Sequence, residues 1–346
     1  MSFLDALWVG SLALVALSLC IVMFLIIHRW LDGRIERHLK LRRGQVEAAI
    51  FAFLDGKADQ DDVSKAAGHR IELVGEVGLD LVDLVRGQDR EHLIALLAAL
   101  GIADVQRRRA NRGRRLARIT AVARLRCFHD DATQVALQCA LDDRDPDIRL
   151  AAAESLAEIG ALPSVAELVD KLRIGTAQHS QSLRHVFRGL ARRQSGELVA
   201  LLAGEAPSLA KVLALDALGR SGDYGVMAPI IAASEDADVD LRAAAFRALA
   251  DLGHPAALAA VARGLADPAW EVRTQAAICV GRIGLATLLP KLVELLGDSV
   301  WWVRFRAAEA LFALGETGEH AVIAASQGAP GPAARTAHLV LAERAA

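Results

Sequence analysis

Aromatic side chains and cysteine are scarce in this sequence, and the short motifs that mark many enzyme families are missing. Aromatic residues make up 4% of the 346 residues, whereas hydrophobic residues make up 53%. A core with so few rings must be packed mainly by alanine and leucine, as where helices stack on helices. The 4 cysteines show no C-x-x-C spacing, which disfavours a disulfide framework or a zinc site. Because no H-E-x-x-H, P-loop or G-x-S-x-G motif occurs, we predict no catalytic residue, metal or cofactor.

A large excess of charge of one sign is also missing. The formal net charge is −2 at pH 7. Proteins that bind nucleic acid generally carry a marked positive excess, because they neutralise phosphates. Nucleic acid is therefore a disfavoured partner.

A repeat of fixed length fills the second half of the chain. A basic residue returns every 31 residues, and the stretches from Asp267 to Gly284 and from Asp298 to Gly315 share its surroundings. Self-similarity at such a period indicates a solenoid, in which each unit packs on its neighbours. Less regular units lie further back, so residues 111–346 hold eight candidate units, whose slot for the basic residue is filled by Arg115, Arg149, Leu183, Lys211, Arg242, Arg273, Arg304 and Arg335.

Each unit has the spacing of two helices. Counted from Arg273, Val272, Ala276 and Val280 lie at −1, +3 and +7, which places them on one helix face. A second apolar segment precedes each such helix, for example Thr287–Leu296. Glycine, as at Gly315, is suited to end the second helix. The predicted fold is therefore all-α, an α-solenoid of about eight helix pairs.

The motif Asp-Pro-x-x-x-Val-Arg-x-x-Ala-Ala-x-x-Leu-x-x-Leu-Gly resembles the HEAT repeat family, in particular the short bacterial type named after phycobilisome lyases. It covers roughly the last two thirds of the chain. The resemblance implies a ladder in which each arginine binds an aspartate or carbonyls of a neighbouring repeat. The expected ladder residues are Asp143, Arg149, Asp236, Arg242, Asp267, Arg273, Asp298 and Arg304.

The N-terminal segment from Ala6 to Ile27 contains 22 residues without a charge. A helix of that length spans about 33 Å, which is enough to cross a bilayer. We therefore expect a transmembrane helix at residues 6–28, with residues 1–5 outside the cell. Arginine and lysine cluster after it, within residues 29–43. The positive-inside rule then predicts a single-pass inner-membrane protein with a cytoplasmic C-terminal part.

Residues 29–110 lie outside the repeat register. We interpret them as a basic juxtamembrane segment followed by a helical neck, which caps the solenoid at residues 111–346. The predicted neck helices are Gln45–Leu54, Ile71–Arg86 and Glu91–Leu100, and Asp55–Asp62 is the predicted loop.

Two groups of residues are candidates for binding a partner. The first is an arginine run without acidic residues, which begins with Arg107, Arg108, Arg109 and Arg112. Anionic lipid headgroups, an acidic protein or nucleic acid could use it, and the alternative is a solvated helix–turn–helix that keeps the solenoid's end soluble.

The second group is formed by Trp270, Trp301 and Trp302. Trp270 and Trp301 occupy the same repeat slot, three residues before the arginine, which points away from the core position. Exposed tryptophans in adjacent repeats would form a ridge suited to protein binding. The alternative is that they pack onto the turn of the neighbouring repeat.

The predicted function is that of a membrane-anchored scaffold that binds a protein and catalyses no reaction. Resemblance to anchored bacterial HEAT-repeat proteins implies a membrane-associated partner, such as an enzyme of envelope or exopolysaccharide synthesis. The alternative is a tethered repeat enzyme, similar to bilin lyases or to HEAT-repeat hydroxylases that bind two irons. Such hydroxylases need His-Glu pairs in register, whereas Glu91-His92 and Glu319-His320 have the reverse order and no register.

Overall fold

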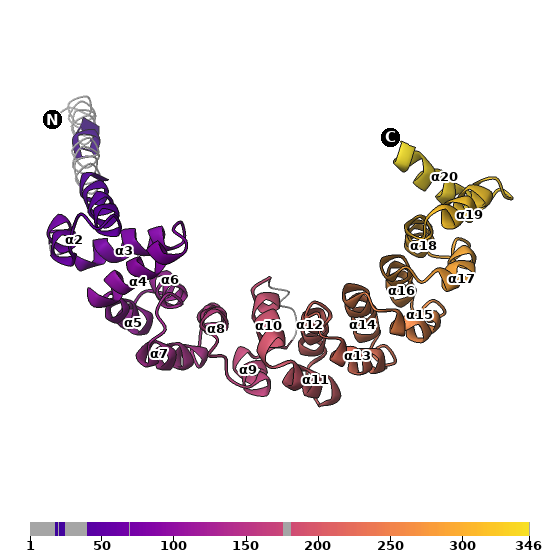
Figure 1. Ribbon diagram of the computed structural model, residues 1–346, viewed down its shortest axis with the longest axis horizontal. Helices are drawn as coiled ribbons and strands as arrows, with labels where there is room; N and C mark the ends of the chain where they lie inside the picture. The colour runs from indigo at the N-terminus through magenta and orange to yellow at the C-terminus, as the bar shows by residue number, and fades with distance from the viewer. Residues whose placement is uncertain (1–17, 20, 25–39, 69, 176–180, 346) are drawn as a thin grey trace, which may run out of the picture. The chain divides into compact units, whose positions relative to one another are not determined.

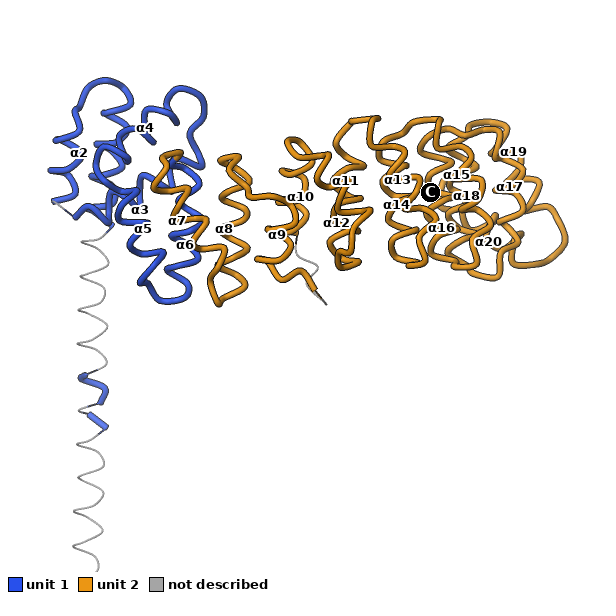
Figure 2. The backbone as a smooth tube through the Cα atoms, turned by 90° about the horizontal axis from the view of Figure 1, so that it is seen from below, with its two compact units in different colours: residues 1–128 blue, residues 129–346 orange. Residues whose placement is uncertain are grey.

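The structure is a computed structural model that describes residues 18–19, 21–24, 40–68, 70–175 and 181–345. These residues form helices and connecting turns, without a strand, so the predicted all-α class is confirmed. The chain divides into two compact units, Met1–Phe128 and His129–Ala346 (Figure 2).

Unit 1 contains the helical residues 40–54 and five further helices: α2 (Gln60–Ala66), α3 (Ile71–Val82), α4 (Gln88–Ala99), α5 (Ile102–Arg112) and α6 (Arg115–Leu125). Helix α2 lies partly within the predicted loop. It begins there because Asp59 and Asp62 form a capping box, in which each side chain accepts a hydrogen bond from the other's backbone N–H. The predicted boundary between neck and solenoid, at residues 110 and 111, falls inside α5.

Unit 2 is a series of helix pairs. Its main helices are α7 (Asp131–Leu141), α8 (Pro146–Ile159), α9 (Val165–Leu172), α10 (Gln181–Arg193), α11 (Ser195–Ala203), α12 (Ser208–Gly219), α13 (Met227–Ala233), α14 (Val239–Leu252), α15 (Leu258–Gly264), α16 (Trp270–Ile283), α17 (Leu289–Leu295), α18 (Trp301–Ala313), α19 (Glu316–Ser326) and α20 (Pro332–Ala345). Short 3₁₀ turns precede α13, α15 and α17. Within the described ranges, these seven pairs and α5–α6 of unit 1 account for the eight predicted units.

The second helices of the pairs form one layer of unit 2, which we call the inner layer. Helices α8, α10, α12, α14, α16 and α18 stand side by side in it, and the row bends toward this side (Figure 1). Small residues allow the close approach. A Cβ added to Gly219 would lie 2.6 Å from the Cα of Ala248, and one added to Gly281 would lie 3.0 Å from that of Ala310. Alanine and glycine at the helix crossings therefore let the helices pack closely with few aromatic side chains between them.

Helix ends follow local signals in the repeats. Asp145 and Asp238 cap α8 and α14 through their side chains. Gly160, Gly253 and Gly284 end their helices in the left-handed conformation, at φ of 72°, 70° and 79°. Gly315 differs from this expectation. It has ψ of −157° and is the N-cap of α19, since Leu314 already caps α18, which ends at Ala313.

The predicted inner-membrane localisation is contradicted. In the part of the chain that the structure describes, no helix combines the length and the apolar character that crossing a bilayer requires. The predicted spanning segment, residues 6–28, lies outside the described residues except for 18–19 and 21–24, and residues 1–5 lie outside them entirely. Anchoring and lipid binding are therefore not part of the function proposed below.

Candidate partner-binding surfaces

Arginine–aspartate rungs connect consecutive repeats of unit 2. Arg242 donates to both carboxylate oxygens of Asp267, at 2.9 and 3.0 Å, and Arg273 donates likewise to Asp298, at 2.8 and 3.0 Å. The remaining Nη1 of Arg273 donates to the backbone carbonyls of Asp267 and Pro268. Each rung thus ties a helix of one repeat to its own preceding turn and to the turn of the next repeat.

Both rungs are largely buried, which makes the carboxylates depend on their arginines. The side chains of Arg273 and Asp298 are 15% and 8% exposed. Burial by itself raises the pKa of Asp298, but the hydrogen bonds from Arg273 and from the Val300 N–H outweigh it, so that this pKa lies below its ordinary value. The pKa of Asp267 is lowered in the same way, by Arg242 and the Ala269 N–H against burial. The rungs are therefore structural.

The ladder is incomplete at its two ends. Arg149 donates to the carbonyls of Asp143 and Arg144, and its buried Nε has no partner among the described residues. Leu183 fills the arginine slot of the next repeat. Arg304 donates to the carbonyls of Asp298 and Ser299 and, at 3.2 Å, to the Thr336 hydroxyl.

The carboxylate of Asp236 accepts a hydrogen bond from a backbone N–H, and among the described residues no arginine donates to it. Its Oδ1 accepts from the N–H of Asp238, at 2.8 Å. Lys211 stands in the arginine slot of the preceding repeat, and within the described residues no hydrogen bond joins its ammonium group to Asp236.

The N-terminal end of α18 carries an aromatic cluster, which we define as the exposed Trp301 and Trp302 with the half-buried Phe305. The rings of Trp301 and Phe305 stack with centroids 5.0 Å apart, and Trp302 meets Trp301 edge-on at 4.6 Å. Trp301 remains 38% exposed and Trp302 48%. Trp270, also 38% exposed, has no ring contact with the cluster among the described residues. The structure thus brings together two of the three candidate tryptophans and adds Phe305.

The candidate arginines of unit 1 lie on α5. Arg107 pairs with Asp104 at 2.7 Å, whereas Arg108 and Arg112 are exposed. Further along the run, Arg124 and Arg126 pair with Asp80 and Asp83 of α3. Several charges of the run therefore stabilise unit 1 itself. Arg109 lines an open hollow together with Arg114 and the exposed Leu116.

A chain of ion pairs crosses the inner layer. Asp216 of α12 accepts from Arg188 of α10 at 3.2 Å and lies 3.7 Å from Arg220. Asp251 of α14 lies 3.2 Å from Arg220 and accepts a short bond from Arg282 of α16. Each of these two carboxylates is thus shared by two arginines.

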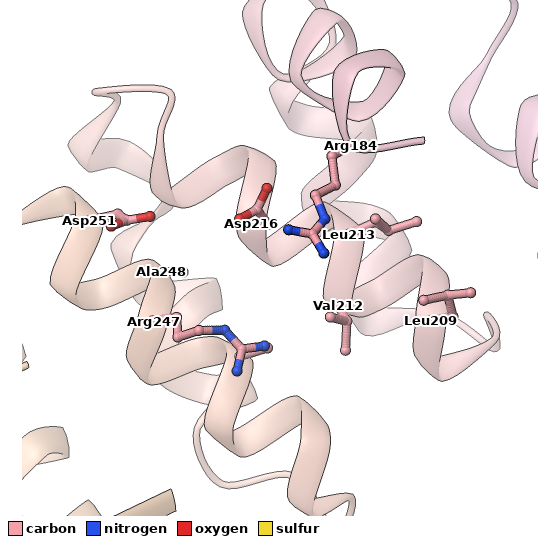
Figure 3. A pocket seen from close by; sticks show the side chains of 9 residues that line it. Arg184, Leu209, Val212, Leu213, Asp216, Arg247, Ala248 and Asp251 are labelled. Atoms are coloured by element: carbon pink, nitrogen blue, oxygen red, sulfur yellow. The ribbon is translucent and has the colours of Figure 1, made fainter. Parts of the chain in front are cut away.

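Two further arginines project into a cavity of about 200 Å³ beside this chain (Figure 3). Arg184 comes from α10 and Arg247 from α14, and α12 supplies most of the apolar floor between them. Neither guanidinium has a hydrogen bond or an ion pair among the described residues. Arg247 is exposed, yet partial desolvation by the surrounding helices lowers its pKa below the ordinary value, and Arg184 adds to this, whereas Asp216, Asp240 and Asp251 act in the opposite direction.

Sequence reasoning missed this cavity because Leu183 interrupts the arginine series there. A signal was nevertheless present. Arg184 and Arg247 occupy slots +1 and +5 of their repeats, which lie on the same helix face. Phe305 occupies slot +1 of its own repeat. The residues at slots +1 and +5 of all repeats would therefore have predicted which side chains lie on the inner layer.

Comparison with known proteins identifies the repeat type. Residues 196–278 and 263–325, which run from α11 into α19, match the family model described as HEAT repeats. The protein therefore carries HEAT repeats in this part of the chain. The phycobilisome-lyase subtype and a partner in envelope synthesis stay predictions. No curated protein matches the sequence.

Several solved structures are similar at low identity. The karyopherin Kap121p bound to the SUMO protease Ulp1p is 11% identical, with a TM-score of 0.44, over 83% of this chain and 39% of that one. A designed armadillo repeat protein is 19% identical, with a TM-score of 0.32, over 61% and 99% of the two chains. Human deoxyhypusine hydroxylase in complex with glycerol is 19% identical, with a TM-score of 0.30, over 78% and 96%. The chain thus spans less than half of the karyopherin.

Proposed function

We propose that this protein is a HEAT-repeat scaffold that holds a protein partner against the inner layer of unit 2 and catalyses no reaction. The observation that carries the proposal is the aromatic cluster, in which the exposed Trp301 and Trp302 contact the half-buried Phe305. Large rings are rare in this chain, and these three gather at the start of one inner-layer helix.

The cluster has the physical properties of an interface anchor. Tryptophan is enriched among residues that dominate binding energy, because it buries a large area at a low cost in side-chain entropy. Here the rings already support one another through stacked and edge-on contacts. A partner would therefore meet a preorganised surface and lose less free energy in ordering it.

The basic residues of the ladder support the same interpretation. Arg242 and Arg273 are held by carboxylates and carbonyls inside the repeat stack, where their role is to connect repeats. The surface that remains for a partner includes the exposed inner-layer residues Arg184, Trp301 and Trp302.

Site-specific crosslinking tests the proposal. A photoreactive benzoylphenylalanine replaces Trp302 in the full chain, and in a matched control it replaces Leu258 of α15, which is exposed outside the inner layer. We expect a discrete crosslinked protein from position 302 and not from 258. The captured protein is then purified and its binding measured directly.

The substitutions Trp301→Ala and Trp302→Ala together should weaken that binding by about tenfold or more, as for hot-spot residues. Arg263→Gln, which removes an exposed pair with Glu235, should leave it unchanged. Equal affinities for all three proteins would refute the aromatic cluster as the binding surface.

A further inference from the structure

Around Asp216 and Asp251 the inner layer has more arginines than these two carboxylates bind. Five arginines, four from α10, α14 and α16 and one that directly follows α12, surround two aspartates, Asp216 and Asp251. Arg188, Arg220 and Arg282 occupy both carboxylates. Arg184 and Arg247 project into the neighbouring cavity without a bound carboxylate (Figure 3). An anion that entered the cavity would therefore meet two guanidinium groups that need not first break a bond.

We propose that Arg184 and Arg247 form a subsite that binds an acidic side chain of a partner protein. The inference deepens the proposed scaffold function, since it names a chemical feature of the partner. The occupant is a glutamate in an extended segment, whose carboxylate contacts the two arginines and whose methylene groups contact the floor.

The dimensions of the cavity favour one side chain over a larger ligand. Its volume of about 200 Å³ is below the range of roughly 300 to 1,000 Å³ that is typical of small-molecule pockets. Its floor is apolar, formed by Leu209, Val212, Leu213, Ala244 and Ala248. Such a floor suits the methylene groups of glutamate. A free phosphate would gain nothing from these side chains.

The subsite lies on the same layer as the aromatic cluster. Arg184 and Phe305 share slot +1 of their repeats, and α12 and α18 are separated by three helix steps. At 8 to 10 Å per step the two sites are roughly 25 to 30 Å apart. An extended segment of about eight residues spans that distance. One polypeptide segment can therefore reach both sites.

The subsite can be tested without the partner. The full chain is labelled with ¹⁵N-arginine, and the Nε–H resonances of Arg184 and Arg247 are assigned from Arg184→Gln and Arg247→Gln. N-acetyl-glutamate N-methylamide is then titrated, with the glutamine analogue as the neutral control. We expect saturable shifts of both resonances with the glutamate probe only. Arg247→Gln should weaken the Arg184 response by about tenfold, and Arg263→Gln should not.

Three outcomes would overturn the subsite: no shift at either arginine, equal shifts with the glutamine analogue, or inorganic phosphate binding at least about tenfold tighter than the glutamate probe. The last outcome would assign the cavity to phosphate.

Failure of the subsite and failure of the scaffold function are distinguishable. If the glutamate probe binds but no partner is crosslinked from position 302, the subsite stands and the scaffold function fails. If a crosslinked partner binds Arg184→Gln/Arg247→Gln as tightly as the unchanged protein, the subsite fails and the scaffold function stands.

Discussion

Unit 2 contains regular repeats and one irregular repeat, formed by α9 and α10. Both kinds are helix pairs, but among the described residues only the regular repeats form arginine–aspartate rungs with the next repeat. In the regular part, Arg242 and Arg273 each bind the aspartate of the next repeat. In the irregular part, Leu183 replaces the arginine. Among the described residues, three buried side-chain polar atoms have no hydrogen-bond partner, and all three lie in the irregular repeat or next to it. They are the Nε of Arg149, the Nε of Arg188 and the Oε1 of Gln194. The arginine–aspartate rungs of the regular repeats thus stabilise the fold, whereas polar atoms without a hydrogen-bond partner occur where these rungs are interrupted.

Breaking a complete rung should have the largest effect. Arg273→Ala leaves the Asp298 carboxylate, 8% exposed, without its cation. Removing one partner of a buried ion pair costs about 3 to 5 kcal/mol. The exposed pair of Arg263 and Glu235 supplies the control, because Arg263→Ala should cost less than about 1 kcal/mol. Urea unfolding followed by circular dichroism measures both, and equal losses would contradict a structural role for the rungs.

An incomplete rung should matter less. Arg149 makes two hydrogen bonds to carbonyls and has no aspartate partner among the described residues of the next repeat. Its replacement in Arg149→Leu also removes a buried Nε that has no partner. We expect a loss of about 1 to 2 kcal/mol in the same unfolding experiment. If Arg149→Leu lowered the free energy of unfolding as much as Arg273→Ala does, the bond between Arg273 and Asp298 would contribute little to stability.

Hydrogen exchange should distinguish the two regions in the unchanged protein. Each buried polar group without a partner costs about 1 to 3 kcal/mol, which lowers the free energy of local opening. Amide protons near the middle of α10 should therefore exchange about tenfold faster than those near the middle of α16. Mass spectrometry of peptides from α10 and α16 measures these exchange rates. Equal protection of the two helices would contradict the prediction that the irregular repeat opens more easily.

Acid should weaken the regular region through its aspartates. The folded-state pKa of Asp298 lies below its ordinary value. Its contribution to stability is therefore fully present above the unfolded pKa of about 3.9 and is lost as the pH falls from there through the folded pKa. The urea concentration at the unfolding midpoint, measured from about pH 5 downward, should therefore decrease once the pH is below about 4. Arg273→Ala should show a shallower fall, and an unchanged slope would contradict the assignment.

The fold was largely predictable because its signals are local and periodic. Val272, Ala276 and Val280 mark a buried helix face, and all three have no exposed surface. Gly160 and Gly253 end helices where expected. Helix α2 was missed because its capping residues, Asp59 and Asp62, lie in a polar stretch that resembles a loop.

The candidate sites were harder to predict, because side-chain contacts between helices decide them. Trp270 and Trp301 occupy equal slots, yet only α18 places a phenylalanine one turn later to stack on its tryptophan. Arg184 and Arg247 are 63 positions apart in sequence and meet only through the packing of α10, α12 and α14. The motif that identifies the repeats contains neither of them.

The most direct test of the scaffold function is the affinity of the full chain for the partner captured at position 302. Isothermal titration calorimetry compares the unchanged protein with Trp301→Ala/Trp302→Ala, after urea unfolding has shown equal stability. We predict binding that is about tenfold weaker or more in the variant. Unchanged affinity would contradict the proposal that the inner layer binds a protein partner through its aromatic cluster.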